Sequence, residues 1–455
     1  MSIPADVKKK IFKAAEALTD EAIKLSCDLI KIPSENPGYL YTKDYFEKYC
    51  ADLYEKPVTF GGEKKVNQFL EPIMKEFCDE TFMLAKDPLR PNLVGIIKGT
   101  GKSKSLALNA HIDTVPTGPH EEWKWKDPFS AKVQDGKIWG RGATDDKVDA
   151  ACIIMAAKAI QKAGYKLKGQ LQLHTTPGEE TGEGKTLGPG WLTASDKRFK
   201  TDACIIAEAS APPNRLGICP CSSGVSWLNI TVNGKPVHAS QRYRTIRSGY
   251  EGENVGVSAV DKCFKIYRAL HELEQEWAIV KKDETGLTPH GFPTIGIEWV
   301  YGHPGGIELP FFVSDHCEIG MAVWRNPKEK YEDVKAEVDN VIDSVVKADP
   351  WLSKHPPKVE WRLDWGAFWI EKDHPLTKAV ESAYLKVIGP PAKYHTWQPV
   401  SDARFYEDNG IPCILIGPGD YRVAHAYNEY CAVDEIPDAI KIYALAAMEY
   451  LGFEE

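Results

Sequence analysis

The sequence predicts an α/β protein, in which a mostly parallel sheet with helices on both faces is interrupted by a smaller α+β domain. Before residue 210, short apolar segments alternate with amphipathic ones, which is typical of a parallel sheet covered by helices. Residues 225–364 follow the order strand, helix, strand, strand, helix, strand, which is typical of a ferredoxin-like layer. The first pattern then returns. We therefore expect residues 1–213 and 371–455 to form one discontinuous domain and residues 214–370 to form an inserted one.

Hydrophobic periodicity predicts the individual elements of the first domain. Helices are expected over residues 5–31, 66–77 and 148–164, and strands over 92–98, 105–110, 170–175 and 203–207. Residues 35–62 are rich in aromatic residues and turn formers, and we interpret them as an insertion with a helix near 43–54. The C-terminal segment should contribute helices over 375–388, 402–408 and 435–451 and a strand over 412–416.

The inserted domain begins with an alternating segment over 225–233. Its remaining elements are expected to be a helix over 253–276, strands near 293–300 and 315–325, a charged helix over 328–347 and a strand near 358–364.

Composition excludes several classes of partner. The chain has 455 residues and a net charge of −9 without a basic tract, which argues against binding to nucleic acid or to an acidic membrane surface. No apolar run approaches the roughly 20 residues that a membrane helix needs, and the N-terminus lacks the apolar segment of a secretory signal. Eleven cysteines without framework spacing indicate reduced thiols. We therefore expect a cytoplasmic protein.

Polar residues follow the predicted strands where each strand ends. His111 and Asp113 come after the strand at 105–110, and Asp113 could either orient the imidazole or fix the loop that holds it. Glu179 and Glu180 follow the strand at 170–175, and Glu208 follows the strand at 203–207. Because the carboxyl ends of parallel strands meet at one edge of a sheet, these side chains should lie close together.

The order of several motifs identifies a family. The segment begins with His111-Ile112-Asp113-Thr114-Val115-Pro116, continues with Trp125-Lys126-Asp127-Pro128-Phe129, and ends with Gly140-Arg141-Gly142-Ala143-Thr144-Asp145. Together with Ala424-His425-Ala426 near the C-terminus, these motifs closely resemble the M20 family of metallopeptidases and amidohydrolases, which includes deacylases, carboxypeptidases and dipeptidases.

The resemblance implies a catalytic domain of the zinc-peptidase type that holds two divalent metal ions, zinc or else cobalt or manganese. By this resemblance Asp145 bridges the ions, His111 and Glu208 complete one, and Glu180 and His425 complete the other. Three carboxylates against two dications leave one positive charge, which suits a site that activates water. Glu179 is then the natural general base, and Asp113 supports the site. The resemblance also implies a cis peptide bond between Asp145 and Asp146.

The resemblance makes the inserted domain a lid and a dimerisation domain. His238 matches the histidine that relatives use from the neighbouring subunit of a homodimer to polarise the scissile carbonyl. Arg325 stands where relatives bind a substrate carboxylate, although a structural arginine paired with a lid acid such as Glu318 is the alternative. Gly419 belongs to a glycine-proline-glycine motif expected to contact the substrate. An asparagine motif of relatives reads Ile307-Glu308-Leu309-Pro310 here, which puts substrate identity in doubt.

The sequence thus favours an enzyme that cleaves a small amide in a small-molecule substrate, as an N-acyl amino acid deacylase or a desuccinylase does. A dipeptidase or carboxypeptidase of the same family, or hydrolysis of another C–N bond, is the alternative. A non-catalytic binding protein is disfavoured because Glu179 and all five expected ligands are retained.

Overall fold

The computed structural model describes residues 3–36, 62–101, 104–210, 212–247, 249, 251–282, 285–287, 293–303 and 311–455. Most of the aromatic insertion expected at 35–62, including its helix, and the Ile307–Pro310 motif lie outside the described residues. The contacts divide the chain into two compact units. Unit 1 comprises Met1–Cys221, Phe368–Trp397 and Ser401–Glu455, and unit 2 comprises Ser222–Ala367 and Gln398–Val400. That these units act as a catalytic domain and an inserted lid stays a prediction.

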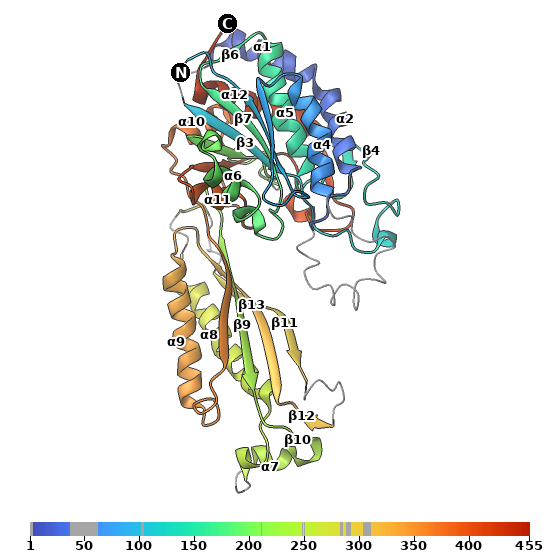
Figure 1. Ribbon diagram of the computed structural model, residues 1–455. Helices are drawn as coiled ribbons and strands as arrows, with labels where there is room; N and C mark the ends of the chain where they lie inside the picture. The colour runs from blue at the N-terminus through green and yellow to red at the C-terminus, as the bar shows by residue number, and fades with distance from the viewer. Residues whose placement is uncertain are drawn as a thin grey trace. The chain divides into compact units, whose positions relative to one another are not determined.

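Unit 1 is built on a six-stranded sheet in the order β1-β2-β7-β3-β8-β15 (Figure 1). Its strands are β1 (Glu80–Leu84), β2 (Asn92–Ile97), β3 (Ser105–His111), β7 (Gln170–Thr176), β8 (Ala203–Ile206) and β15 (Cys413–Leu415). The four strands β7, β3, β8 and β15 run parallel to one another, whereas β2 runs antiparallel to β7 and β1 antiparallel to β2. The mostly parallel sheet predicted from the sequence is confirmed.

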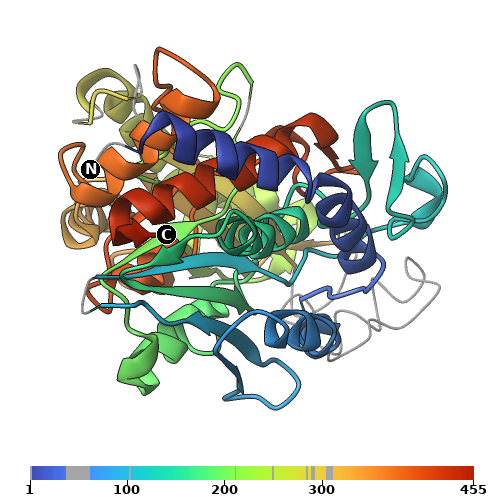
Figure 2. The same ribbon diagram turned by 90° about the horizontal axis from the view of Figure 1, so that it is seen from above.

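Helices cover both faces of this sheet. They are α1 (Ala5–Glu16), α2 (Thr19–Ile30), α4 (Gly62–Lys75), α5 (Lys147–Lys162), α6 (Pro189–Ser195), α10 (Pro375–Val387), α11 (Ala403–Glu407) and α12 (Ile436–Leu451). The largest apolar cluster joins α1, α2, α4, α5, α10 and α12 to one face of the sheet. Helices α6 and α11 pack on the opposite face, and Figure 2 shows the green α6 across the sheet from the blue α1 and α2.

Short strands lie outside the main sheet of unit 1. A three-stranded sheet contains β4 (Lys132–Gln134), β5 (Lys137–Trp139) and β16 (Tyr430–Ala432), and β6 (Lys166–Leu167) pairs with β17 (Phe453–Glu454). Strand β16 ties the segment after His425 to the segment before Asp145, so two motifs far apart in the sequence are held side by side.

Unit 2 is a four-stranded antiparallel sheet in the order β11-β13-β9-β14 with two helices. Its elements in chain order are β9 (Gly224–Asn233), α8 (Ala259–Val280), β11 (Thr294–Gly302), β13 (His316–Arg325), α9 (Tyr331–Ala348) and β14 (Lys358–Trp365). Both helices pack on the apolar face of the sheet. The predicted ferredoxin-like α+β unit is confirmed. The short strands β10 (Val237–His238) and β12 (Phe312–Val313) pair beside it, and helix α7 spans Arg242–Ile246.

Some element predictions were wrong at their boundaries. The single helix expected over residues 5–31 is two helices, α1 and α2, and Thr19 Oγ donates a hydrogen bond back to the carbonyl of Ala15 at the junction (3.2 Å). Acidic residues in the first turn of α2 favour a new helix start there. Helix α8 begins at Ala259 rather than near 253, because the Ser258 side chain accepts the N–H of Asp261 as an N-cap. Strand β1, the β4–β5 hairpin and α6 were not predicted.

Candidate metal and active site

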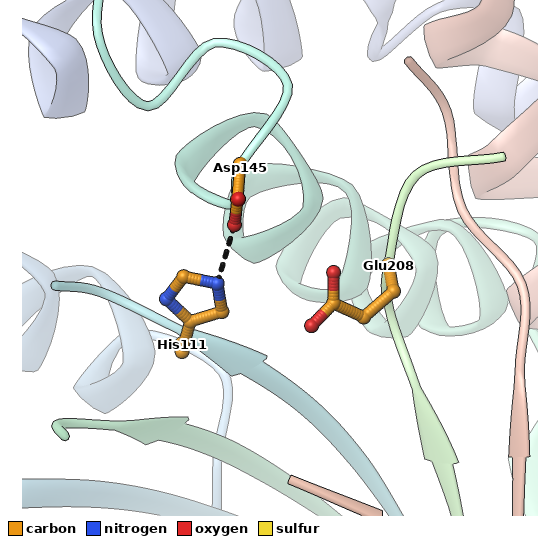
Figure 3. Close-up of side chains that lie close together, drawn as sticks. All are labelled: His111, Asp145 and Glu208. Carbon is orange, nitrogen blue, oxygen red and sulfur yellow. Dashed lines mark hydrogen bonds and ion pairs between the residues drawn. The ribbon is translucent and has the colours of Figure 1, made fainter. Parts of the chain in front are cut away.

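The candidate site lies at the carboxyl ends of three adjacent parallel strands. His111 is the last residue of β3, the turn carrying Glu179 and Glu180 follows β7, and Glu208 follows β8. Asp145 comes two residues before α5. Figure 3 shows the Glu208 carboxylate directed towards His111 and Asp145.

The described residues contain two groups of three side chains that could each hold a metal ion. His111, Asp145 and Glu208 form one, and Asp145, Glu180 and His425 form the other. The two oxygens of Asp145 serve different groups, because Oδ1 lies 2.7 Å from Nε2 of His111 and Oδ2 lies 3.2 Å from Nε2 of His425. His425 Nε2 also lies 2.9 Å from Glu180 Oε2. The structure thus brings together the same five residues, in the same two groups, that the motifs suggest.

The electrostatics of the two groups suit cations. Burial raises the pKa of Glu208 well above its usual range and that of Glu180 to about 7. Burial lowers the pKa of His425, but its hydrogen bonds to Asp145 and Glu180 outweigh this effect and raise it to about 11. The carboxylates of Asp145 and Glu180 therefore favour a positive charge beside His425, which a divalent ion bound to the neutral imidazole would supply. No hydrogen bond or ion pair from a described residue reaches the Glu208 carboxylate, which is 6% exposed. A nearly buried carboxylate without a partner is costly, and a divalent ion would supply one.

The loop that carries Asp145 is held by a residue the sequence reasoning missed. Glu429 Oε1 accepts the N–H groups of Thr144 (2.8 Å) and Asp145 (3.1 Å), and its Oε2 lies 2.5 Å from Nη1 of the buried Arg141. The peptide bond between Asp145 and Asp146 is cis, as the resemblance implies. The position of Glu429 just after His425 in the last motif is the signal that could have identified it.

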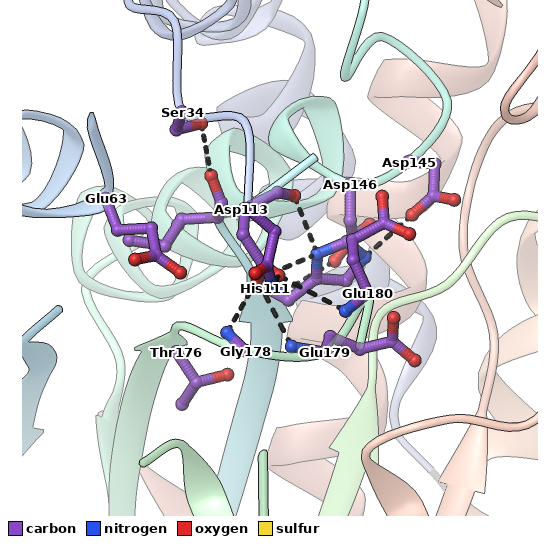
Figure 4. A network of polar contacts seen from close by, with 12 residues as sticks. Ser34, Glu63, His111, Asp113, Asp145, Asp146, Thr176, Gly178, Glu179 and Glu180 are labelled. Atoms are coloured by element: carbon purple, nitrogen blue, oxygen red, sulfur yellow. Dashed lines mark hydrogen bonds and ion pairs between the residues drawn. The ribbon is translucent and has the colours of Figure 1, made fainter. Parts of the chain in front are cut away.

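Asp113 contacts both His111 and the turn at residues 178–180, through different atoms. Its main-chain carbonyl lies 3.0 Å from Nδ1 of His111, which is the orienting contact. Its buried carboxylate instead accepts the N–H groups of Gly178 (2.9 Å), Glu179 (3.3 Å) and Glu180 (3.2 Å), as Figure 4 shows. Asn36 Nδ2 donates a further hydrogen bond at 2.6 Å. The carboxylate of Asp113 therefore fixes the turn, and its Oδ1 also lies 3.6 Å from Nδ1 of His111, farther away than the main-chain carbonyl.

Glu179 projects from the same turn as Glu180 but has different surroundings. Its side chain is 8% exposed, and within the described part of the chain no hydrogen bond or ion pair reaches its carboxylate. Burial raises the pKa of Glu179 well above its usual range, which suits a group that must take up a proton. Gly178 makes the turn possible, because its φ of +86° lies in the left-handed region.

The three residues expected to bind substrate lie in different settings. Gly419, in unit 1, has φ +115° and donates its N–H to Glu435 Oε2 (2.7 Å), and a Cβ there would lie 3.0 Å from Thr144 Oγ. His238, in unit 2, is exposed at the end of β10, and its Nδ1 accepts the N–H of Ser240 (3.2 Å). The substrate-binding roles of these two residues stay predictions.

Arg325 is buried within unit 2, where its guanidinium is already engaged. Nη2 lies 2.6 Å from Asp364 Oδ1, and Nη1 donates to Ser226 Oγ at 2.8 Å. The side chain is 3% exposed. This arrangement favours the structural alternative, although the partner is Asp364 on β14 rather than Glu318.

Comparison with known proteins places the chain in a family. Residues 107–449 match the model of Peptidase family M20/M25/M40. The chain belongs to the M20 peptidase family. No helix among the described residues is long and apolar enough to cross a membrane.

Among curated M20 relatives, the N-formyl-4-amino-5-aminomethyl-2-methylpyrimidine deformylase of Halalkalibacterium halodurans is 32% identical over 364 residues, which cover 77% of this chain and 80% of the relative. The deformylase of the same name from Bacillus subtilis is 31% identical over 78% of this chain and 82% of its own length. A probable succinyl-diaminopimelate desuccinylase of Staphylococcus aureus is 23% identical over 88% of this chain and 96% of its own length. The chain is accordingly a metal-dependent hydrolase that acts on C–N bonds.

Solved structures share the fold. The di-peptidase Dug1p of Saccharomyces cerevisiae superposes with a TM-score of 0.70 at 14% identity, covering 97% of this chain and 98% of that one. The M20 metallo-carboxypeptidase Sso-CP2 of Sulfolobus solfataricus gives 0.68 at 17% identity, covering 94% and 99%. At these identities the likeness concerns the fold alone.

Proposed function

We propose that this protein is a dinuclear amidohydrolase that removes a small acyl group from an amine nitrogen. The observation that carries the proposal is the pair of donor groups that share Asp145, with Glu179 on the adjoining turn. The two deformylases that are 31–32% identical support removal of a small acyl group.

His111, Asp145 and Glu208 would hold one ion, and Asp145, Glu180 and His425 the other. Imidazole and carboxylate donors suit zinc best, with cobalt or manganese as alternatives. When bound, two such ions would lower the pKa of an attacking water and polarise the amide carbonyl.

Glu179 supplies the proton transfers of the reaction. Its carboxylate accepts a proton from the attacking water and then donates it to the nitrogen of the leaving amine. Because Asp113 holds the amides of Glu179 and Glu180, one contact positions both the base and a metal ligand. This shared anchor fixes the backbone of the base relative to that of the proposed metal ligand Glu180.

The setting of Arg325 favours a substrate that carries no free carboxylate. The guanidinium of Arg325, the cation that the lid motif offers, is paired with Asp364 and so is not available to a substrate carboxylate. Dipeptides and N-acyl amino acids carry such a carboxylate, which makes hydrolysis of these substrates the second candidate function. Gly419 would contact the substrate within unit 1.

We also infer a homodimer in which His238 acts on the neighbouring subunit's site. Strand β11 forms one edge of the unit 2 sheet, and Trp299, Val300 and Tyr301 are exposed along it. An unpaired edge of this kind is a template for pairing with a second chain. The ten described cysteines form no disulfide with one another, which supports a reducing compartment such as the cytoplasm.

The test combines metal analysis with a substrate panel. The purified chain, loaded in turn with zinc, cobalt and manganese, would be assayed on N-formyl and N-acetyl amines, N-acyl amino acids and dipeptides. We expect about two metal ions per chain and the highest kcat/KM on an N-acyl amine. Faster hydrolysis of carboxylate-bearing substrates would favour the second candidate, and no hydrolysis of any amide by any metal form would refute the proposal.

A further inference from the structure

One face of β7 is polar although it is buried. Gln172, His174 and Thr176 alternate along the strand and therefore point to the same side, and each is fully buried. Most strand faces inside a covered sheet are apolar. A buried polar row is stable only if its groups are hydrogen-bonded to one another.

The row is continuous with helix α11 and with strand β3. His174 lies 2.8 Å from Gln172 through Nε2 and 2.7 Å from the hydroxyl of Tyr406 through Nδ1. Tyr406 donates to Asn109 Oδ1 at 3.0 Å, and Thr176 Oγ lies 3.1 Å from the same oxygen. The chain of contacts thus runs along β7 towards the carboxyl end of the strand, where the site lies.

Asp402 lies at the end of this hydrogen-bonded row, next to the turn that carries Glu179. Its Oδ2 lies 3.2 Å from Thr176 Oγ and 3.5 Å from Asn109 Nδ2. Its Oδ1 faces Gly184, where a Cβ would lie 2.5 Å away. Gly184 donates its N–H to the carbonyl of Gly178 (2.7 Å), which closes the turn. Asp402 is therefore hydrogen-bonded to the residue before the turn and lies close to Gly184 at its other end, where Oδ1 makes no hydrogen bond among the described residues.

Two aspartates therefore adjoin the turn. Asp113 accepts its middle amides, and Asp402 is hydrogen-bonded to Thr176 before it and lies close to Gly184 after it (Figure 4 shows Asp113, Thr176 and the turn). Only Asp113 belongs to a motif that the sequence reasoning singled out. Asp402 is 1% exposed, and its side chain hydrogen-bonds to Thr176 and Asn109 rather than to a residue of either donor group.

We propose that Asp402 is a positioning residue that directs the Glu179 carboxylate without binding metal or substrate. The proposal rests on the proposed role of Glu179 as the base. It predicts a loss in kcat rather than in KM or in metal content, because a misplaced base slows proton transfer while the ligands stay in place.

The experiment compares Asp402→Ala with Asp402→Asn. Asparagine has the same size as aspartate and keeps an oxygen that can accept the hydrogen bonds of Thr176 and Asn109, so it is the conservative replacement. We expect Asp402→Ala to lower kcat by about 10- to 100-fold, as small misplacements of catalytic groups do. KM should change less than about 3-fold, the metal content should be unchanged, and Asp402→Asn should recover most of the activity. Asp408→Ala, at the exposed end of the same helix, is the matched control.

Two further readouts separate this proposal from the proposed function. In metal-free protein, hydrogen exchange of peptides covering residues 177–184 should speed up in Asp402→Ala and not in Asp408→Ala, whether or not the chain hydrolyses amides. In a Glu179→Gln background, Asp402→Ala should lower kcat no further, because its effect passes through Glu179. Unchanged exchange together with unchanged kcat would overturn the proposal, and so would an additive loss in the double variant.

Discussion

Replacing Asp113 by alanine tests the structural account of the site most directly. The variant keeps the main-chain carbonyl that contacts His111 Nδ1 but removes the carboxylate that accepts three backbone N–H groups and Asn36 Nδ2. The turn bearing Glu179 and Glu180 should therefore loosen. His111 keeps its 3.0 Å contact with the carbonyl and loses the longer 3.6 Å contact with the carboxylate.

The size of the effect follows from those four hydrogen bonds. Each bond to a charged group contributes about 1.5–3 kcal/mol, but two of the three backbone contacts are longer than 3.1 Å and the four are not additive. Removing one side of a buried charged network costs about 3–5 kcal/mol, which we take as the expected loss in the free energy of unfolding. An exposed helical aspartate such as Asp343 should cost less than about 0.5 kcal/mol when replaced by alanine.

The loss of stability in Asp113→Ala should become smaller as the pH falls. Burial raises the pKa of Asp113, but His111, Arg90 and Asn36 outweigh it and lower the pKa below the unfolded value. The stabilisation by the carboxylate is therefore fully present above the unfolded pKa of about 4 and is lost as the pH falls. The difference in stability between wild type and Asp113→Ala should shrink below that pH.

The assay is urea unfolding of metal-free protein, followed by metal analysis of the reloaded protein. Removing metal first keeps ligand binding from contributing to stability. The ion held by Glu180 and His425 should be lost preferentially, so the metal content should fall from about two towards about one per chain. An unfolding free energy within about 1 kcal/mol of the wild type would refute the reasoning, because the hydrogen bonds of the Asp113 carboxylate would then contribute little to stability.

Four other outcomes are expected. Glu179→Gln should keep about two metal ions per chain yet lower kcat by about 10²–10⁴-fold, because the amide cannot accept a proton; a near-normal rate would remove Glu179 as the base. Asp145→Ala should empty both metal sites, since one carboxylate serves both groups, and a fully loaded variant in metal analysis would contradict this. Arg325→Ala should lower the stability of unit 2 by about 1–3 kcal/mol, yet leave the kcat/KM ratio of a carboxylate substrate to its carboxamide unchanged; a selective loss on the carboxylate would restore a substrate role. Mixed dimers of His238→Ala and Glu179→Gln chains should recover part of the activity, and subunit exchange without recovery would exclude action across the dimer.

The donor set of the site could be predicted because its signals are local. His111, Glu180 and Glu208 each stand at the end of a strand, and parallel strands bring their ends to one edge. The order of the motifs then supplied Asp145 and His425. The fold class followed from the alternation of strands and helices for the same reason, because periodicity is a property of each short segment.

The tertiary structure alone decided which partners the other polar groups have. Asp113 meets the turn at 178–180, Arg325 meets Asp364 across the unit 2 sheet, and Asp402 lies against Thr176 from a helix more than 200 residues away in sequence. Such contacts join elements through packing, and no spacing or period within one segment specifies them. A charged residue in a motif therefore identifies the kind of group that is needed, whereas the folded neighbours decide whether it serves the substrate, the metal or the scaffold.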